Sequence, residues 1–175
     1  MKKTIAISVL LLFCGYLTID AQVVLFPNNK STELFDLHKG KRCIEIITED
    51  DSTETYFEFT VLKKKREMIY VDICAPDFAH VDNICKYSRQ AWVRVADTKI
   101  YGKARGCEGR TFAFYKKPKY EAKTIAFDLK DIGDEFQVID ICGLWLKVQF
   151  IYEGKKIRLW LSPESQCSSI FNGCT

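Results

Sequence analysis

The sequence predicts an all-β protein built from two small β-barrels in tandem, of which the first carries loop insertions. Three observations support this prediction. The chain is rich in Phe, Tyr, Ile and Val and poor in long Ala/Leu/Glu runs, a composition typical of strands. Short segments alternate between apolar and polar residues. The same order of segments also occurs twice along the chain, which indicates an internal repeat.

The first 21 residues have the character of a signal peptide. Lys2 and Lys3 precede an apolar run over residues 4–19, and Ala21 supplies a small residue before Gln22, where a signal peptidase would cut. We therefore expect residues 1–21 to be removed and the protein to be secreted or periplasmic. The run is short for a membrane span, so no span is expected after cleavage. A retained anchor or a lipid on Cys14 is the alternative.

The charge of the chain argues against nucleic acid as a partner. The formal net charge is +3, and loss of the signal peptide with Lys2, Lys3 and Asp20 lowers it to +2. Binding to a phosphate backbone needs a stronger basic excess. The remaining length suits one ordinary domain or two small ones.

The repeat is clearest at a shift of 77 residues. Residues 58–71 read EFTVLKKKREMIYV, and residues 135–148 read EFQVIDICGLWLKV. Outside this core, "AWV" at 91–93 matches "LWL" at 159–161, and "FDL" occurs at 35–37 and again at 127–129. The blocks keep the same order, so the sequence predicts a duplication, with halves at 22–105 and 106–175.

The second half shows the strand pattern most clearly. Apolar residues at 146, 148 and 150 alternate with polar ones, and the pattern resumes over residues 157–161. Glu153-Gly154 is typical of a hairpin turn between these two strands. Ser162 followed by Pro163 predicts the start of a helical turn. Short strands, a tight hairpin and one helical turn in about 70 residues predict a small barrel.

These residues resemble a known family. "WLKV" at 145–148, Gly154 in the hairpin and "WL" at 160–161 are similar to the corresponding parts of bacterial SH3-like domains. The resemblance covers residues 111–165. The first half, residues 24–105, matches through "WVRV" at 92–95 but carries two insertions and lacks a Gly before Met68. The resemblance implies an SH3-like barrel in each half and a ligand groove beside the loop after the first strand of the second half.

Seven cysteines remain after signal cleavage, and export makes disulfides the expected state. Cys74 and Cys85 bracket a loop insertion, and a bridge there would contribute about 2.5–3 kcal/mol in the chain-entropy model. Cys167 and Cys174 are candidates to pin the C-terminal tail. The pairing of the others, Cys43, Cys107 and Cys142, stays open, and the odd number leaves at least one thiol free or paired between chains. The sequence lacks Cys-x-x-Cys pairs and His-rich tracts, so no metal site is expected.

The sequence offers no catalytic constellation. His38 and His80 are the two histidines, and His80 lies inside the Cys74–Cys85 loop, where a bridge would remove the thiols. Asp131 and Asp134 flank a Gly-containing turn, which explains them as turn residues. Phosphate-loop and dinucleotide-binding motifs are absent, so no cofactor is expected. We expect a protein that is not an enzyme, with a Cys/His enzyme as an alternative.

The aromatic residues indicate a binding surface more clearly than the titratable residues indicate a catalytic site. Alternation predicts that the three tryptophans lie on polar strand faces beside Arg and Lys, where large aromatics are candidate contact residues. A Lys-rich loop, 116–119, separates two tyrosines. The predicted ligand-binding residues are Tyr115, Tyr120, Trp145 and Trp160. The alternative is that the tryptophans pack one barrel on the other or cover a barrel end. Residues 63–66, KKKR, are predicted to form a solvated hairpin tip.

Taken with the resemblance, these features predict a secreted, non-catalytic binding protein that recognises cell-wall peptide or a protein partner. A second possibility is a periplasmic inhibitor or immunity-type protein that acts through the acidic run at 49–51 and the cysteine-bracketed loop of the first half.

Overall fold

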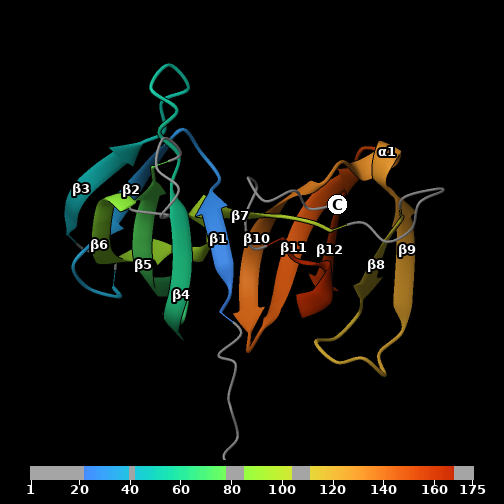
Figure 1. Ribbon diagram of the computed structural model, residues 1–175. Helices are drawn as coiled ribbons and strands as arrows, with labels where there is room; N and C mark the ends of the chain where they lie inside the picture. Colours follow the sequence, from blue (N-terminus) through green and yellow to red (C-terminus); the bar gives the residue numbers. More distant parts are fainter. Residues whose placement is uncertain (1–21, 40–41, 78–84, 104–110, 168–175) are drawn as a thin grey trace, which may run out of the picture.

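The computed structural model describes residues 22–39, 42–77, 85–103 and 111–167. Within them the chain is all-β, as predicted, and its sheet is antiparallel, with twelve strands and three short helical turns (Figure 1). The elements are β1 (Val24–Pro27), β2 (Ser31–Phe35), β3 (Cys43–Thr48), β4 (Glu58–Lys65), β5 (Met68–Pro76), β6 (Cys85–Arg94), η1 (Val95–Asp97), β7 (Thr98–Tyr101), β8 (Thr111–Tyr115), β9 (Thr124–Asp128), α1 (Leu129–Ile132), β10 (Glu135–Cys142), β11 (Trp145–Tyr152), β12 (Lys155–Leu161) and η2 (Pro163–Ser165).

The elements come in the same order in both halves. The hairpin β2–β3 is followed by the three-stranded β4–β5–β6 and by the 3-10 turn η1. The hairpin β8–β9 is followed by α1, β10–β11–β12 and the 3-10 turn η2. Figure 1 shows the two sets as lobes side by side, with β1 between them and β10 at the adjoining edge of the second lobe.

The first hairpins of the two three-stranded units have features that lie 77 residues apart. β4 begins at Glu58 and β10 at Glu135. A β-bulge interrupts β4 between Val61 and Lys63, and one interrupts β10 between Val138 and Asp140, again 77 residues apart. Each hairpin therefore bends at the same point.

One sequence match is wrong. "FDL" at 35–37 was aligned with "FDL" at 127–129, but Phe35 lies in β2, opposite Trp92, whereas Phe127 lies in β9, opposite Phe112. The residue that pairs with Trp160, in the second half, is Tyr115. Tyr115 is thus the structural counterpart of Phe35, because each begins the contact between the first hairpin and the last strand of its half.

A single sheet joins the two halves. Its strand order is β3-β2-β6-β5-β4-β1-β7-β10-β11-β12-β8-β9. β1 contacts β4 through the Leu25↔Phe59 pair and β7 through Phe26↔Lys99. β7, from the first half, then pairs with β10, from the second. The pairings leave the two end strands, β3 and β9, unpaired with each other in the described residues, so the ladder is open.

One hydrophobic core extends through both halves. Leu146, Val148 and Phe150 of β11 all point into it, as the alternation predicted. Gly102 sits where the halves meet, and a Cβ atom there would lie 2.5 Å from the Phe112 ring and 2.7 Å from the Phe136 ring. A glycine is therefore needed to let the rings of the second half reach β7.

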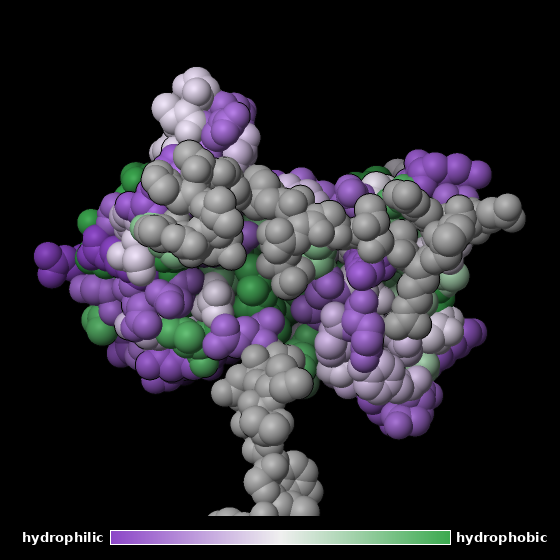
Figure 2. Space-filling view, in the orientation of Figure 1, coloured by the Kyte–Doolittle hydropathy of each residue, from purple (hydrophilic) through white to green (hydrophobic). Residues whose placement is uncertain are grey.

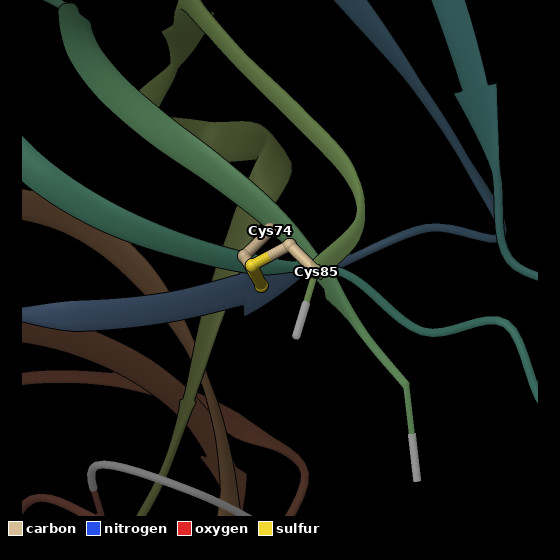
Figure 3. Close-up of a disulfide and its surroundings, with 2 residues drawn as sticks. All are labelled: Cys74 and Cys85. Carbon is tan, nitrogen blue, oxygen red and sulfur yellow. A yellow bond between two sulfur atoms is a disulfide. The ribbon is translucent and has the colours of Figure 1, made fainter. Parts of the chain in front are cut away.

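The structure shows the bonding state of five of the cysteines. Cys74 and Cys85 form a disulfide with a Cα–Cα distance of 5.4 Å, which confirms the predicted bridge (Figure 3). Cys167 is disulfide-bonded, and Cys174, its predicted partner, lies outside the described residues. Cys43 and Cys142 are free and exposed. Cys107 lies outside the described residues.

None of the helices in the described ranges is long and apolar enough to cross a membrane. The predicted signal peptide, residues 1–21, lies outside those ranges. Figure 2 shows that most of the visible surface is hydrophilic and that hydrophobic side chains reach the surface between the lobes.

Candidate functional site

The outer face of the second half carries the predicted aromatic residues. On β11 the even-numbered apolar side chains enter the core, so Trp145 and Lys147 project from the opposite face. Both are half-buried. Strand alternation therefore places Trp145 and Lys147 on the outer face, because the apolar residues that alternate with them fill the core.

Strand register brings two further aromatics to this face. Trp160 of β12 lies directly opposite Lys147 of β11 and, on its other side, opposite Tyr115 of β8. Residues directly opposite in adjacent strands point to the same face. The Lys147 Nζ lies 5.8 Å from the centre of the Trp160 ring, within the range of a cation–π contact.

Three of the predicted residues are in ring contact. The centroids of Tyr115 and Trp145 are 5.0 Å apart, those of Tyr120 and Trp145 4.9 Å, and those of Tyr115 and Tyr120 6.2 Å. Edge-to-face contacts at these distances are the favoured geometry for aromatic pairs. We name Tyr115, Tyr120, Trp145 and Trp160 the aromatic platform.

The loop between β8 and β9 holds Tyr120 over the platform. Its ends are tied by the Lys116 amide donating to the Lys123 carbonyl at 3.1 Å, and its tip by the Ala122 amide donating to the Lys119 carbonyl at 3.1 Å. The Tyr120 hydroxyl donates to the Glu164 carboxylate of η2. Tyr120 still exposes 53% of its surface, so the ring is positioned and also accessible.

The platform has a basic border. Lys116, Lys117 and Lys119 of the loop are exposed, and Lys147 lies on the platform itself. The Glu164 carboxylate, which accepts from Tyr120, is the acidic group at this border that contacts the platform. A partly exposed aromatic surface with lysines beside it suits a ligand that has apolar parts and carboxylates.

η2 forms as the sequence predicted, with Ser162 before its first residue and Pro163 at the first helical position. The Ser162 hydroxyl does not cap the backbone. It bonds the Ser165 hydroxyl at 3.2 Å instead. Glu164, between them, is thereby held toward Tyr120.

The first half has a counterpart of the platform that the sequence reasoning missed. Trp92 packs with Phe35, Met68 and Tyr70 in a cluster separate from the main core. As alternation predicted, Trp92 lies on the strand face opposite the main core, but it is covered there and only 8% exposed, so this candidate contact residue is not accessible. Phe35 and Met68 cover it, at the positions where the second half has Tyr115 and Trp145. The repeat alignment could have found Met68, which was matched to Trp145.

The predicted basic tip at residues 63–66 is the β4–β5 hairpin end and is exposed, and two of its lysines, Lys63 and Lys64, have partners. The Lys63 Nζ lies 4.6 Å from the Tyr70 ring centre and 5.4 Å from that of Trp92. Lys64 forms an ion pair with Asp140 of the second half and donates to the Ile141 carbonyl at 3.0 Å.

The other candidate residues from the sequence are His38, His80, Asp131 and Asp134. His38 is partly buried and meets the Trp92 ring at 5.6 Å, whereas His80 lies outside the described residues. Asp131 falls in α1 and Asp134 follows the positive-φ Gly133, in agreement with turn chemistry. In the described part of the chain no group of His, Cys, Asp and Glu side chains is arranged to hold a metal ion.

No family model matches the sequence, and no curated protein or solved structure matches it either.

Proposed function

We propose that the protein is a secreted, non-catalytic binding protein made of two SH3-like halves, and that its aromatic platform recognises cell-wall peptide. The observation that carries this proposal is the gathering of Tyr115, Tyr120 and Trp145, in ring contact, on a partly exposed face. Large aromatic rings gathered on an accessible face are candidate interface anchors. Their retention at the surface beside lysines marks a contact surface.

The order of elements supports the SH3-like assignment of both halves. Each consists of a hairpin, a three-stranded unit and a 3-10 turn, and in each half the hairpin meets the last strand. This is the arrangement expected of a small SH3-like barrel. The loop that follows the first strand of the second half carries Tyr120, where the resemblance places the ligand groove.

The chemistry of the platform favours a peptide. Flat rings pack against the peptide backbone and apolar side chains and lose little conformational entropy on binding. Lysines on the border, Lys116 and Lys117 among them, complement carboxylates. Bacterial cell-wall peptides combine small apolar side chains with carboxylates.

A protein partner is the second candidate. The loop between β3 and β4 forms a turn closed by the Asp50↔Thr55 bridge, and the Asp50 carboxylate accepts from the Ser52 amide at 2.9 Å. Figure 1 shows this loop standing out from the first lobe. An ordered acidic projection of this kind suits an inhibitor or immunity-type protein.

An enzyme that uses Cys74 or Cys85 with His80 is disfavoured, because both sulfurs are in the disulfide. A thiol must be deprotonated and free to act as a nucleophile. The disulfide therefore removes the two thiols on which that alternative depends.

The test is retention of the mature, oxidised protein on purified peptidoglycan. We expect Tyr115→Ala and Trp145→Ala to lose retention, because each removes a ring that contacts the other. Ile151→Ala is the matched control, since Ile151 lies on the same strand as Trp145 and is 53% exposed but is distant from the platform. Tyr120→Phe keeps the ring and should keep most of the retention.

A wild-type protein that is not retained would overturn the cell-wall assignment. Capture from a periplasmic extract, with the Asp50→Asn variant beside the wild type, would then test the protein-partner alternative. Equal loss of retention in Ile151→Ala and Trp145→Ala would show that the platform is not the binding surface.

A further inference from the structure

A cavity lies where the two halves meet, away from the aromatic platform. Its volume is about 910 Å³, and Met68, Val95 and Ile139 provide apolar lining. Met68 and Val95 belong to the first half and Ile139 to the second. Its size is in the range of sites that hold drug-sized ligands or several residues of a peptide.

The lining of this junction groove is predominantly basic. Lys39, Arg66 and Arg94 line it, against the single carboxylate of Glu67. Lys39 and Arg66 are exposed and form no ion pair with any other described residue. Two cations are therefore available to a ligand.

Arg94 is held in place. Its Nη1 donates to Glu33 at 2.7 Å and lies 3.5 Å from Asp97, and the guanidinium stacks on the Phe35 ring at 4.5 Å. The hydrogen bond that Arg94 donates to the Glu33 carboxylate is the main cause of a raised pKa for Arg94. Glu33 and Asp97 neutralise part of this charge but do not line the groove.

The walls of the groove are tied together across the junction. The Val95 amide donates to the Glu67 carbonyl at 2.9 Å, which fixes the β4–β5 turn to η1. Gln137 of β10 donates to the Ala96 carbonyl at 3.0 Å. Ile139 is the extra residue of the β10 bulge, and bulges commonly redirect a side chain toward a functional surface. The groove is therefore formed before a ligand arrives.

From this placement we infer that the junction groove is a second binding site, which takes an acidic peptide segment with apolar side chains between its carboxylates. The bound carboxylates contact Lys39 and Arg66, with the fixed Arg94 as a third cation, and the apolar side chains pack on Met68, Val95 and Ile139. A small inorganic anion would leave the apolar lining and most of the volume unused. The site is independent of the aromatic platform and of what the platform binds.

His38 also lines the groove and reports on its charge. Burial lowers the pKa of His38, and the nearby cations Lys65, Lys39 and Arg66 lower it further. A carboxylate bound among these cations offsets them, so the pKa of His38 should rise when a ligand binds.

The experiment measures binding of a synthetic peptide of alternating Glu and Leu to the mature protein at low salt. We expect the double variant Lys39→Gln/Arg66→Gly to bind it about tenfold more weakly. Arg66 has a φ of 58°, so glycine there removes the cation without straining the turn. The matched control, Lys155→Gln/Lys156→Gln, loses the same charge at exposed positions of the β11–β12 hairpin, outside both the groove and the platform, and should bind as the wild type does.

Three results would overturn the inference. The first is absence of binding by the wild type, and the second is an equal loss in the two double variants, which would indicate charge alone. The third is equally tight binding of polyphosphate, which lacks apolar groups. The position of the peptide is checked by NMR: the pKa of His38, measured by titration, should be higher with the peptide bound than without it. Retention of Lys39→Gln/Arg66→Gly on peptidoglycan should be unchanged, so the two sites are tested separately.

Discussion

At the scale of single residues, the two halves differ at a turn position that the sequence comparison singled out. The two-residue turns β4–β5 and β10–β11 begin with Arg66 and Gly143, and both residues have a φ of 58°. Positive φ at the first turn position favours glycine strongly. Arg66 occupies the position where the second half has Gly143. Its backbone is therefore strained in an otherwise equivalent turn.

This strain predicts that Arg66→Gly stabilises the protein. A side chain in the left-handed region costs about 1 kcal/mol, and relief of that cost should raise the free energy of unfolding by a similar amount, less the entropy gained by the unfolded chain. Chemical denaturation of the wild type and the variant measures the difference. Gly143→Ala should show the opposite sign, and a destabilised Arg66→Gly would mean that contacts of the Arg66 side chain outweigh the strain.

At the scale of elements, the strands and turns of the second half were predictable because the signals are local. Alternation identified the core side of β11, and Glu153-Gly154 marked the turn in which both residues have positive φ. The burial of Trp92 was not predictable, because its cover comes from Phe35 on a strand far away in the sequence. The same distance explains the wrong "FDL" match, in which identical letters fall on strands with different partners.

The loop between β5 and β6 is the element most dependent on covalent support. Its ends are joined by the Cys74–Cys85 disulfide, 11 residues apart, whereas β11 and β12 are joined by a tight two-residue turn. We expect the double variant Cys74→Ser/Cys85→Ser to lose about 2.5–3 kcal/mol of stability, because its unfolded chain gains loop entropy. Thermal unfolding with and without reductant checks this. The wild type should lose stability on reduction, and the variant should lose less.

At the scale of the whole molecule, the junction between the halves is the feature that the sequence left open. β1 pairs with both β4 and β7, and β7 pairs with β10, so a strand of one predicted domain extends the sheet of the other. None of these pairings leaves a local pattern, since each joins segments that are distant in the sequence. The aromatic platform could be predicted, because the four residues belong to one half. The junction groove could not, because its lining comes from both halves.

The ion pair between Lys64 and Asp140 joins the halves and should make their association sensitive to acid. Burial acts to raise the pKa of Asp140, but the hydrogen bonds from Lys64 and the Ile141 amide outweigh it, and the pKa is lowered overall. The unfolded chain therefore binds a proton more readily than the folded protein does. The stabilisation is present above the unfolded pKa of about 3.9 and is lost as the pH falls through the lower folded value.

Asp140→Asn removes this dependence. We expect the variant to be less stable than the wild type near neutral pH and the gap between their melting temperatures to close as the pH falls from about 5 to about 3. Asp72→Asn is the control, because its carboxyl is not part of a described ion pair and lies in the first half. Thermal melts across that pH range measure both. A gap that stays constant with pH would show that the ion pair does not contribute to holding the two halves together, and the shared strands β1 and β7 would then account for the junction on their own.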